Sequence, residues 1–204
     1  AASDVYKRQE VGCATGALTQ LLAQQADKVI AVEIDKTLAK IAQTQLKDTE
    51  NAEIINIDIL KNKNTINPIV TDALQQARKK QTGKVLLVAN LPFNVACPVI
   101  ANLIKGPTIV DAMYVTVQKE VAQRMIAPPD SDHYGSLSIL MAATGRVKII
   151  RTLKPTVFWP RPKVSSAMVQ FIREENKAGR IKNMELFSNV VNCLFTHRRK
   201  TLKA

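Results

Sequence analysis

Short apolar segments alternate with amphipathic segments through the first 145 residues of this 204-residue chain. The short runs are typical of buried strands, and the longer segments space their apolar residues three and four apart, as helices do. This alternation predicts an α/β fold in which helices cover both faces of a doubly wound, mostly parallel sheet. The expected strands are 29–33, 53–57, 84–89 and 112–117, and the expected helices are 15–26, 38–46, 68–80, 98–105, 119–127 and 136–143.

The pattern changes after Gly145. Two strand-like segments, 147–153 and 167–171, flank a proline-rich loop at 155–162, and the polar segment 173–180 reads as a linker. An amphipathic helix is expected from residue 184 to 194. It is too short to close a second domain.

The net charge of +12 is concentrated in the last third of the chain. Residues 1–140 hold 15 Lys and Arg against 14 Asp and Glu, whereas residues 141–204 hold 14 against 3. This asymmetry favours a polyanionic partner, with nucleic acid as the first expectation and an anionic membrane as the second. A basic surface that merely aids solubility is the alternative.

The distribution of cysteine and histidine argues against a metal site or a disulfide framework. Cys13, Cys97 and Cys193 are far apart and form no CxxC pair, and His133 and His197 stand alone. No apolar run reaches the roughly 18 residues of a membrane span. We therefore expect a cytoplasmic protein without metal or membrane association, and a monomer.

The segment Asn90-Leu91-Pro92-Phe93 directly follows the apolar run 84–89. Open α/β sheets bind their ligands at the carboxyl edge of the strands, where such a turn lies. An amide side chain, two carbonyl groups aimed with the help of Pro92 and an aromatic face together suit a flat, amine-bearing group such as an adenine. A proline turn with Phe93 in the core is the alternative.

A second candidate site surrounds the loop that opens the first helix. Small residues at Gly12, Ala14 and Gly16 allow a ligand to approach the backbone closely, and the helix start adds exposed N–H groups. Glu33 ends the next strand, where a carboxylate can accept from both hydroxyls of a ribose. Asp58 follows the third strand, where it can accept from an adenine amine. An ordinary helix cap or surface charge is the alternative for each acid.

Two cofactor classes fit these acids. The spacing Gly12-x-Ala14-x-Gly16 lacks the GxGxxG pattern of nicotinamide dinucleotide enzymes, and no plausible hydride-relay residue is evident. It is similar to the GxGxG of S-adenosylmethionine-dependent methyltransferases. Those enzymes also carry an amine-aiming turn after the fourth strand, which is where Asn90–Phe93 falls.

Together these motifs resemble those of the ribosomal RNA adenine dimethyltransferases, and the small-subunit dimethyladenosine transferases are the best match. The resemblance covers about residues 10–203. It rests on 12–19, 33–35, Asp58, 90–94, Gln118-Lys119-Glu120-Val121, Tyr134-Gly135-Ser136-Leu137-Ser138, Phe158-Trp159-Pro160-Arg161-Pro162-Lys163-Val164, Ser166-Ala167 and Arg198-Arg199-Lys200-Thr201-Leu202.

The resemblance implies a Rossmann-like class I methyltransferase that dimethylates the N6 of adjacent adenines near the 3′ end of small-subunit (16S-type) ribosomal RNA. The substrate would lie within the 30S-type subunit, and the reaction would belong to ribosome biogenesis. S-adenosylmethionine would lie over Gly12, Ala14 and Gly16. The implied roles of the other residues are cofactor binding for Glu33, Asp58 and Asn90, catalysis for Asn90, Leu91, Pro92 and Phe93, base contacts for Phe93 and Phe158, and phosphate contacts for Arg161, Lys163, Arg198, Arg199 and Lys200.

The chain departs from the family pattern at both ends. Residues 1–9 are polar where the family's first strand is apolar, so we expect them to be foreign or atypical. The methyltransferase domain is expected at 10–173, and 181–204 is expected to start a truncated helical domain. Two alternatives remain: a large-subunit adenine methyltransferase of the antibiotic-resistance type, and a non-catalytic RNA-binding assembly factor on the same fold.

Overall fold

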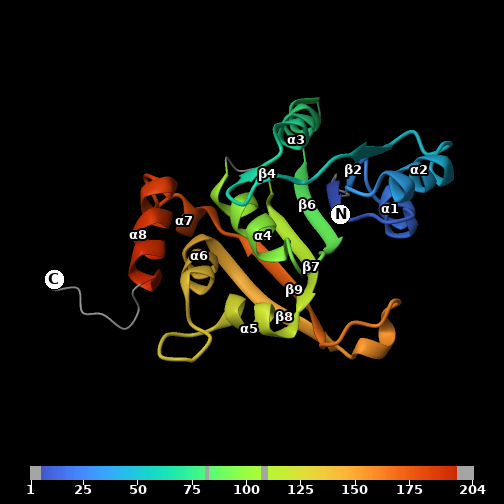
Figure 1. Cartoon of the computed structure of the whole chain (residues 1–204). Coiled ribbons are helices and arrows are strands. Elements are labelled where there is room, and N and C mark those ends of the chain that lie inside the picture. The colour runs from blue at the N-terminus through green and yellow to red at the C-terminus, as the bar shows by residue number, and fades with distance from the viewer. Residues whose placement is uncertain (1–5, 81–82, 107–109, 197–204) are drawn as a thin grey trace, which may run out of the picture.

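A seven-stranded sheet organises the protein, as a computed structural model that describes residues 6–80, 83–106 and 110–196 shows (Figure 1). The strand order is β3-β2-β1-β6-β7-β9-β8. The first five strands in this order are parallel, and β9 runs antiparallel to both β7 and β8. The strands are β1 (Tyr6–Val11), β2 (Lys28–Glu33), β3 (Ala52–Asn56), β6 (Lys84–Asn90), β7 (Ala112–Gln118), β8 (Gly145–Leu153) and β9 (Ser166–Arg173).

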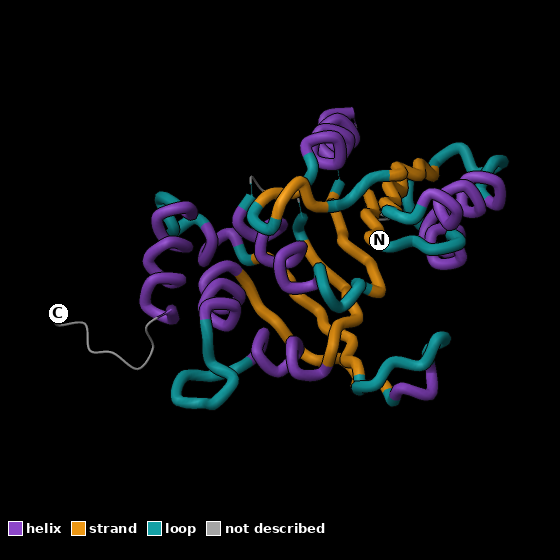
Figure 2. The backbone as a smooth tube through the Cα atoms, in the orientation of Figure 1, coloured by secondary structure: helices purple, strands orange, loops and turns teal. Residues whose placement is uncertain are grey.

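Helices cover the two faces of this sheet unequally (Figure 2). Four helices share one core with a single face: α3 (Pro68–Lys80), α4 (Ala96–Lys105), α5 (Lys119–Ile126) and α6 (Ser136–Thr144). The opposite face is packed by α1 (Ala17–Ala23) and α2 (Lys36–Gln45), which cover the region of β1 to β3. Over β7 and β9 that opposite face stays partly accessible, and Tyr114, Met168 and Ile172 are each more than a third exposed.

The remaining elements are short or peripheral. A small hairpin, β4 (Leu60–Asn62) and β5 (Thr65–Ile66), follows β3, and the 3₁₀ turn η1 (Pro155–Val157) lies between β8 and β9. The chain then forms α7 (Glu175–Ala178) and α8 (Met184–Thr196), and α8 packs beside α6. No helix within the described ranges is both long and apolar enough to cross a membrane.

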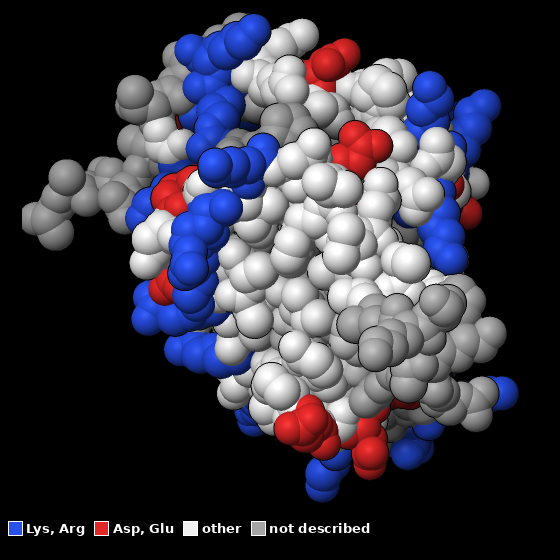
Figure 3. Space-filling view, turned by 90° about the vertical axis from the view of Figure 1, so that its left-hand side faces the viewer, with Lys and Arg blue, Asp and Glu red and all other residues white. Residues whose placement is uncertain are grey.

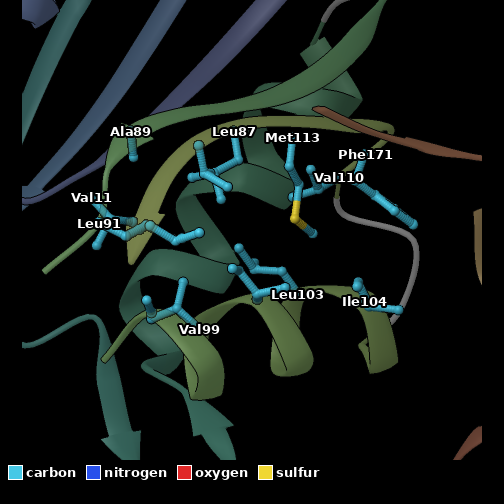
Figure 4. Packing of buried hydrophobic residues seen from close by; sticks show 14 of the residues in the cluster. Val11, Leu87, Ala89, Leu91, Val99, Leu103, Ile104, Val110, Met113 and Phe171 are labelled. Carbon is cyan, nitrogen blue, oxygen red and sulfur yellow. The ribbon is translucent and has the colours of Figure 1, made fainter. Parts of the chain in front are cut away.

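The main core lies between the strands at the sheet centre and α4 (Figure 4). Leu87 and Met113 from adjacent strands face Leu103 of the helix, and all three are fully buried. Burying each such side chain contributes roughly 1.5–3 kcal/mol. Leu91, the first residue after β6, belongs to the same cluster, so the turn that follows β6 is anchored in the core.

The expected alternation of strands and helices is confirmed, with local differences. α1 begins at Ala17 rather than residue 15, because Gly16 has a left-handed φ of 90° that a helix cannot contain. α6 begins at Ser136, and the N–H of Gly135, the residue before it, donates to the Ser138 hydroxyl. The expected linker at 173–180 is wrong in part: β9 runs through Arg173, and α7 follows.

The polar segment before Glu10 forms an interior strand of the sheet. β1 pairs with β2 on one side and β6 on the other. The N–H and C=O groups of both neighbouring strands need hydrogen-bond partners, and the backbone of β1 supplies them regardless of its side chains. The side chains conflict with this position. Lys7 and Gln9 are buried, and both amide atoms of Gln9 lack a hydrogen-bond partner among the described residues.

Replacing Gln9 by leucine should stabilise the protein by about 1–3 kcal/mol, because a desolvated and unsatisfied amide is removed from the core. Urea denaturation of the variant and the parent chain measures this. Gln20→Leu, on the exposed side of α1, is the matched control and should change stability little. An unchanged or lower stability of Gln9→Leu would show that the amide is satisfied in solution.

Candidate active site

The loop between β1 and α1 adopts a conformation that few residue types accept. Gly12, Ala14 and Gly16 have φ values of 73°, 48° and 90°, all in the left-handed region. A Cβ on Gly16 would lie 3.1 Å from the Leu46 side chain and 3.3 Å from Ala42, so glycine also allows the loop to approach α2. The alternating left-handed residues give a tight backbone cradle at the end of β1.

Glu33, at the end of β2, holds this cradle in place. One carboxylate oxygen accepts from the Ala14 N–H at 2.8 Å, and the other accepts from the Asp35 N–H at 2.9 Å. The residue is only 6% exposed. A carboxylate has about four acceptor positions, so two remain for further donors such as the hydroxyl groups of a ribose. The loop-holding role of Glu33 was missed from sequence, because it involves a backbone N–H 19 residues away.

Asp58 lies next to Glu33 at the same sheet edge. Asn56, which ends β3, pairs with Glu33, and its side-chain amide donates to the Glu33 carbonyl at 2.8 Å. Two residues later, Asp58 is exposed and accepts from the Leu60 N–H at 2.9 Å. Neighbouring strand ends therefore bring together the two acids that the sequence singled out.

The turn after β6 is fixed by bonds on both sides. The Leu91 N–H donates to the Thr116 carbonyl of β7 at 3.1 Å. The Pro92 carbonyl accepts from Val95 at 3.1 Å and from Ala96 at 3.0 Å, which starts α4. The Pro92 carbonyl is therefore engaged by the fold, which leaves the Asn90 side chain and the Leu91 carbonyl as the acceptors that can face a ligand.

The amide side chain and the aromatic side chain of this turn both remain accessible. Asn90 is exposed, and Phe93 is half-buried and does not belong to the buried core cluster. The alternative in which Phe93 is a core residue is thus not what the structure shows. A half-buried ring that is held by a fixed turn can still offer a face to a planar group.

The cradle and the turn lie against each other. A Cβ built on Gly12 would be 3.2 Å and 3.3 Å from two carbon atoms of Pro92, and 4.0 Å from the carbonyl oxygen of Asn90. Two segments about 80 residues apart in sequence thus form one continuous surface at the carboxyl edge of β1 and β6. A group bound over residues 12–16 therefore lies beside whatever Asn90 holds.

Beneath the cradle is a buried acid that sequence reasoning did not single out. Glu10 is 2% exposed, and the Thr19 hydroxyl donates to its carboxylate at 2.6 Å. Burial is the main cause that raises the pKa of Glu10 to about 7, while the bond from Thr19 opposes the shift and the Glu33 charge adds to it. The signal available in the sequence was an acid two residues before Gly12 and a hydroxyl nine residues after that acid.

The cysteine in this loop is unsuited to act as a nucleophile. Burial, followed by the charges of Glu10 and Glu33, raises the pKa of the Cys13 thiol to about 12. The thiol therefore stays protonated at neutral pH, which agrees with a packing role. No cluster of three or more His, Cys, Asp or Glu residues with metal-binding geometry occurs in the part of the chain that the structure describes.

The other predicted site residues are farther along the chain. Phe158 is half-buried, and Arg161 and Lys163 are exposed; all three lie in the loop between η1 and β9. The Ser165 carbonyl accepts from the Lys119 N–H, which ties the end of this loop to the carboxyl end of β7. Arg198, Arg199 and Lys200 lie outside the described residues.

Comparisons with known proteins agree with this geometry. Residues 7–204 match the model of the family described as ribosomal RNA adenine dimethylase. A protein of Clostridium perfringens named ribosomal RNA small subunit methyltransferase A is 39% identical over 193 residues, which is 95% of this chain and 64% of that protein. A relative from Lachnoclostridium phytofermentans with the same name is 37% identical over 195 residues, with the same coverage of both chains. The chain thus spans about two thirds of the length of these relatives.

Solved structures share the fold. A dimethyladenosine transferase from Plasmodium falciparum superposes with a TM-score of 0.77 at 27% identity, covering 96% of this chain and 65% of that one. The 23S rRNA methyltransferase ErmE superposes with a TM-score of 0.71 at 22% identity, covering 95% and 71%, and this likeness concerns the fold alone. The predicted Rossmann-like, class I methyltransferase fold is therefore confirmed.

Stability should fall as pH rises from about 4.5 to about 7, because folded Glu10 keeps its proton over this range and unfolded Glu10 does not. The folded state then binds more protons than the unfolded state, so raising the pH disfavours folding by up to about 3 kcal/mol. Glu10→Gln, which retains an acceptor for Thr19, should flatten this dependence. Urea midpoints measured across the range test it.

Glu50→Gln, an exposed position, is the control and should leave the pH profile of the parent chain unchanged. If Glu10→Gln loses stability with pH as steeply as the parent chain does, another group causes the slope.

Proposed function

Because the chain belongs to the ribosomal RNA adenine dimethylase family, we propose that it transfers methyl groups from S-adenosylmethionine to the N6 of adjacent adenines in small-subunit ribosomal RNA. The observation that carries this proposal is the contact between the cradle at Gly12 and the turn at Pro92. With this contact, a cofactor held by the cradle would lie beside a base held by the turn. The proposed setting is the 30S-type subunit in the cytoplasm, with the protein acting as a monomer.

The cradle fits the proposed cofactor. Gly12, Ala14 and Gly16 leave the backbone open to a ligand, and Glu33 retains acceptor positions for ribose hydroxyls while it holds the loop. Asp58 is exposed at the neighbouring strand end, where it can accept from the cofactor's adenine amine. When bound, S-adenosylmethionine supplies a methyl group on a sulfonium, which is an excellent leaving group.

The residues of the turn would position the target adenine. The N6 lone pair of adenine is delocalised into the ring, so the amine is a poor nucleophile. Acceptance of its two N–H groups by the Asn90 side chain and the Leu91 carbonyl would hold the amine partly pyramidal and direct the lone pair toward the cradle. Positioning and fixed dipoles then supply most of the rate enhancement, without a strong general base.

An adenine must leave its stack to enter such a site. Phe93, with Phe158 on the other side of the base, would recover part of that cost, since stacking on an aromatic ring contributes roughly 1–3 kcal/mol per base. Arg161, Lys163 and the C-terminal Arg198, Arg199 and Lys200 are the proposed phosphate contacts. A second methylation of the same nitrogen requires the monomethyl product to turn or rebind.

The direct test incubates the chain with S-adenosylmethionine and small ribosomal subunits that lack dimethyladenine, followed by mass spectrometry of the digested RNA. We expect N6,N6-dimethyladenosine in small subunits and none in purified large subunits. Methylation of large subunits would indicate the antibiotic-resistance type. Tight RNA binding without transfer would indicate a non-catalytic assembly factor.

Asn90→Ala should lower methyl transfer by at least about 100-fold, as removal of a single positioned polar group does in other enzymes. In the proposed arrangement the Asn90 side chain accepts from the target base and the cradle holds the cofactor, so S-adenosylmethionine affinity should change little while the backbone pairing of Asn90 is retained. Asn94→Ala, an exposed amide in the same segment, is the matched control and should keep its activity. Full activity of Asn90→Ala would remove Asn90 from the mechanism.

Phe93→Ala should weaken RNA binding by about 1–3 kcal/mol and leave cofactor affinity nearly unchanged, because the ring stacks on the base and not on the cofactor. Phe93→Tyr retains the ring and should bind RNA like the parent chain. Parallel titrations with RNA and with S-adenosylmethionine make the comparison. Equal losses for both ligands would contradict a stacking role.

A further inference from the structure

Positive charge is concentrated around the edge strand β8. Residues 141–173 contain seven Lys and Arg and no Asp or Glu. β8 ends the sheet, and Arg146, Lys148 and Arg151 on it are all exposed. Figure 3 shows Lys and Arg side chains gathered along one margin of the side on which α7 and α8 lie, beside a broad uncharged surface. The edge strand itself carries exposed cations along its length.

A β-bulge places two of these cations on the same side of the sheet. Lys148 pairs with Gln170 and Arg151 pairs with Met168, with a register shift between Ile149 and Arg151. Residues three apart on a regular strand point to opposite faces, but the extra residue in the bulge re-aims the side chain that follows it. As a result, Arg151 points to the accessible face with Lys148 instead of into the core.

The charges at this location differ in how far they are neutralised. Arg146 forms an ion pair with Glu174, which also accepts from Lys177. Lys148, Arg151 and Lys154 form no ion pair within the described residues, and all three are exposed. We call these three residues the β8 track. Three uncompensated cations along one strand end repel one another, and a polyanion would relieve this repulsion.

The sheet register connects the β8 track to the proposed base site. Asn90 pairs with Thr116, Thr116 with Met168, and Met168 with Arg151. Cross-strand partners point to the same face, so Asn90 and Arg151 belong to one row of side chains on the accessible face. Three strand spacings separate them, or about 14 Å. That distance corresponds to about four stacked nucleotides.

An exposed tryptophan follows the track. β8 leads through Lys154 and η1 to Trp159, whose exposed fraction of 96% is the largest among the large hydrophobic residues that the structure describes. Figure 1 shows this loop projecting beyond the strands. A large apolar ring in water gains from contact with a partner, and proteins that bind single-stranded RNA combine such rings with basic grooves.

We propose that the β8 track binds RNA phosphates within about four nucleotides of the target adenine, while Trp159 stacks on an unpaired base of the same strand. Cations without paired carboxylates fit a phosphate backbone, and the row of side chains that connects Arg151 to Asn90 favours RNA over a membrane surface of the same charge. This inference rests on the proposed function, because it takes ribosomal RNA as the partner. It adds contacts on the sheet edge to those expected in the loop and at the carboxyl terminus.

The test measures binding of the full 204-residue chain to undermethylated small ribosomal subunits between 50 and 200 mM salt. Lys148→Gln/Arg151→Gln removes two phosphate contacts, so the slope of log K against log salt should become shallower by about 1.4–1.8. Lys40→Gln/Lys47→Gln, two exposed lysines in and just after α2, beside β3 at the opposite edge of the sheet, is the charge-matched control and should retain the parent slope. S-adenosylmethionine binding should be equal in all three proteins.

Trp159→Ala should weaken RNA binding about 5- to 150-fold at every salt concentration without changing the slope, since stacking releases no counterions. Trp159→Phe should recover most of this loss. If Lys148→Gln/Arg151→Gln keeps the salt slope of the parent chain, the track does not bind phosphates. If Trp159→Ala binds RNA as tightly as the parent chain, Trp159 does not stack on a base. If Lys148→Gln/Arg151→Gln loses binding to phosphatidylglycerol vesicles but binds RNA like the parent chain, the track binds a membrane instead.

The outcome is separable from that of the proposed function. If the parent chain methylates small subunits and the track variant keeps the parent slope, the function stands and the track is wrong. If the parent chain transfers no methyl group but its salt-dependent RNA binding requires Lys148 and Arg151, the track stands and the catalytic proposal fails.

Discussion

The architecture of the site depends on the parallel pairing of β1 with β6 at the centre of the sheet. This pairing brings the end of one strand beside the end of another that lies some 80 residues later. Gly12 and Pro92 then approach so closely that even a methyl group on residue 12 would press against the proline ring. The cradle and the amide-bearing turn are thus parts of one rigid surface, as expected for a site that must hold two reactants in fixed geometry.

Two buried acids support this surface through different physics. Glu33 has its charge stabilised by backbone N–H donors from the cradle and from the start of α2, so it can position the loop while still accepting from a ligand. Glu10 has one hydroxyl donor and is otherwise desolvated, which raises its pKa to about 7. The first acid is suited to ligand binding, whereas the second couples the stability of the cradle to protonation.

Much of this arrangement could be predicted from sequence, because parallel sheets have a regular relation between strand ends and binding sites. Asn90, Glu33 and Asp58 each follow an apolar run, and the structure brings their strand ends to one edge. The apposition of Gly12 and Pro92 could not be read from spacing, since it depends on strand order. The bulge at Ile150 also escaped prediction, because nothing in a run of alternating cations and apolar residues marks an added residue.

The first strand shows where prediction from the side-chain pattern fails. A polar segment with Lys7 and Gln9 does not look like an interior strand, yet its backbone completes the sheet between β2 and β6. Side-chain pattern predicts burial, whereas backbone hydrogen bonding can impose a position at a cost in stability. The unsatisfied Gln9 amide is that cost.

The central claim is that the cradle at residues 12–16, held by Glu33, is an S-adenosylmethionine site. Isothermal titration of the chain with S-adenosylmethionine, and separately with NADH, tests it most directly. The account predicts saturable binding of S-adenosylmethionine at one site per chain and no binding of NADH. Binding of NADH, or a folded chain that binds neither compound, would contradict it.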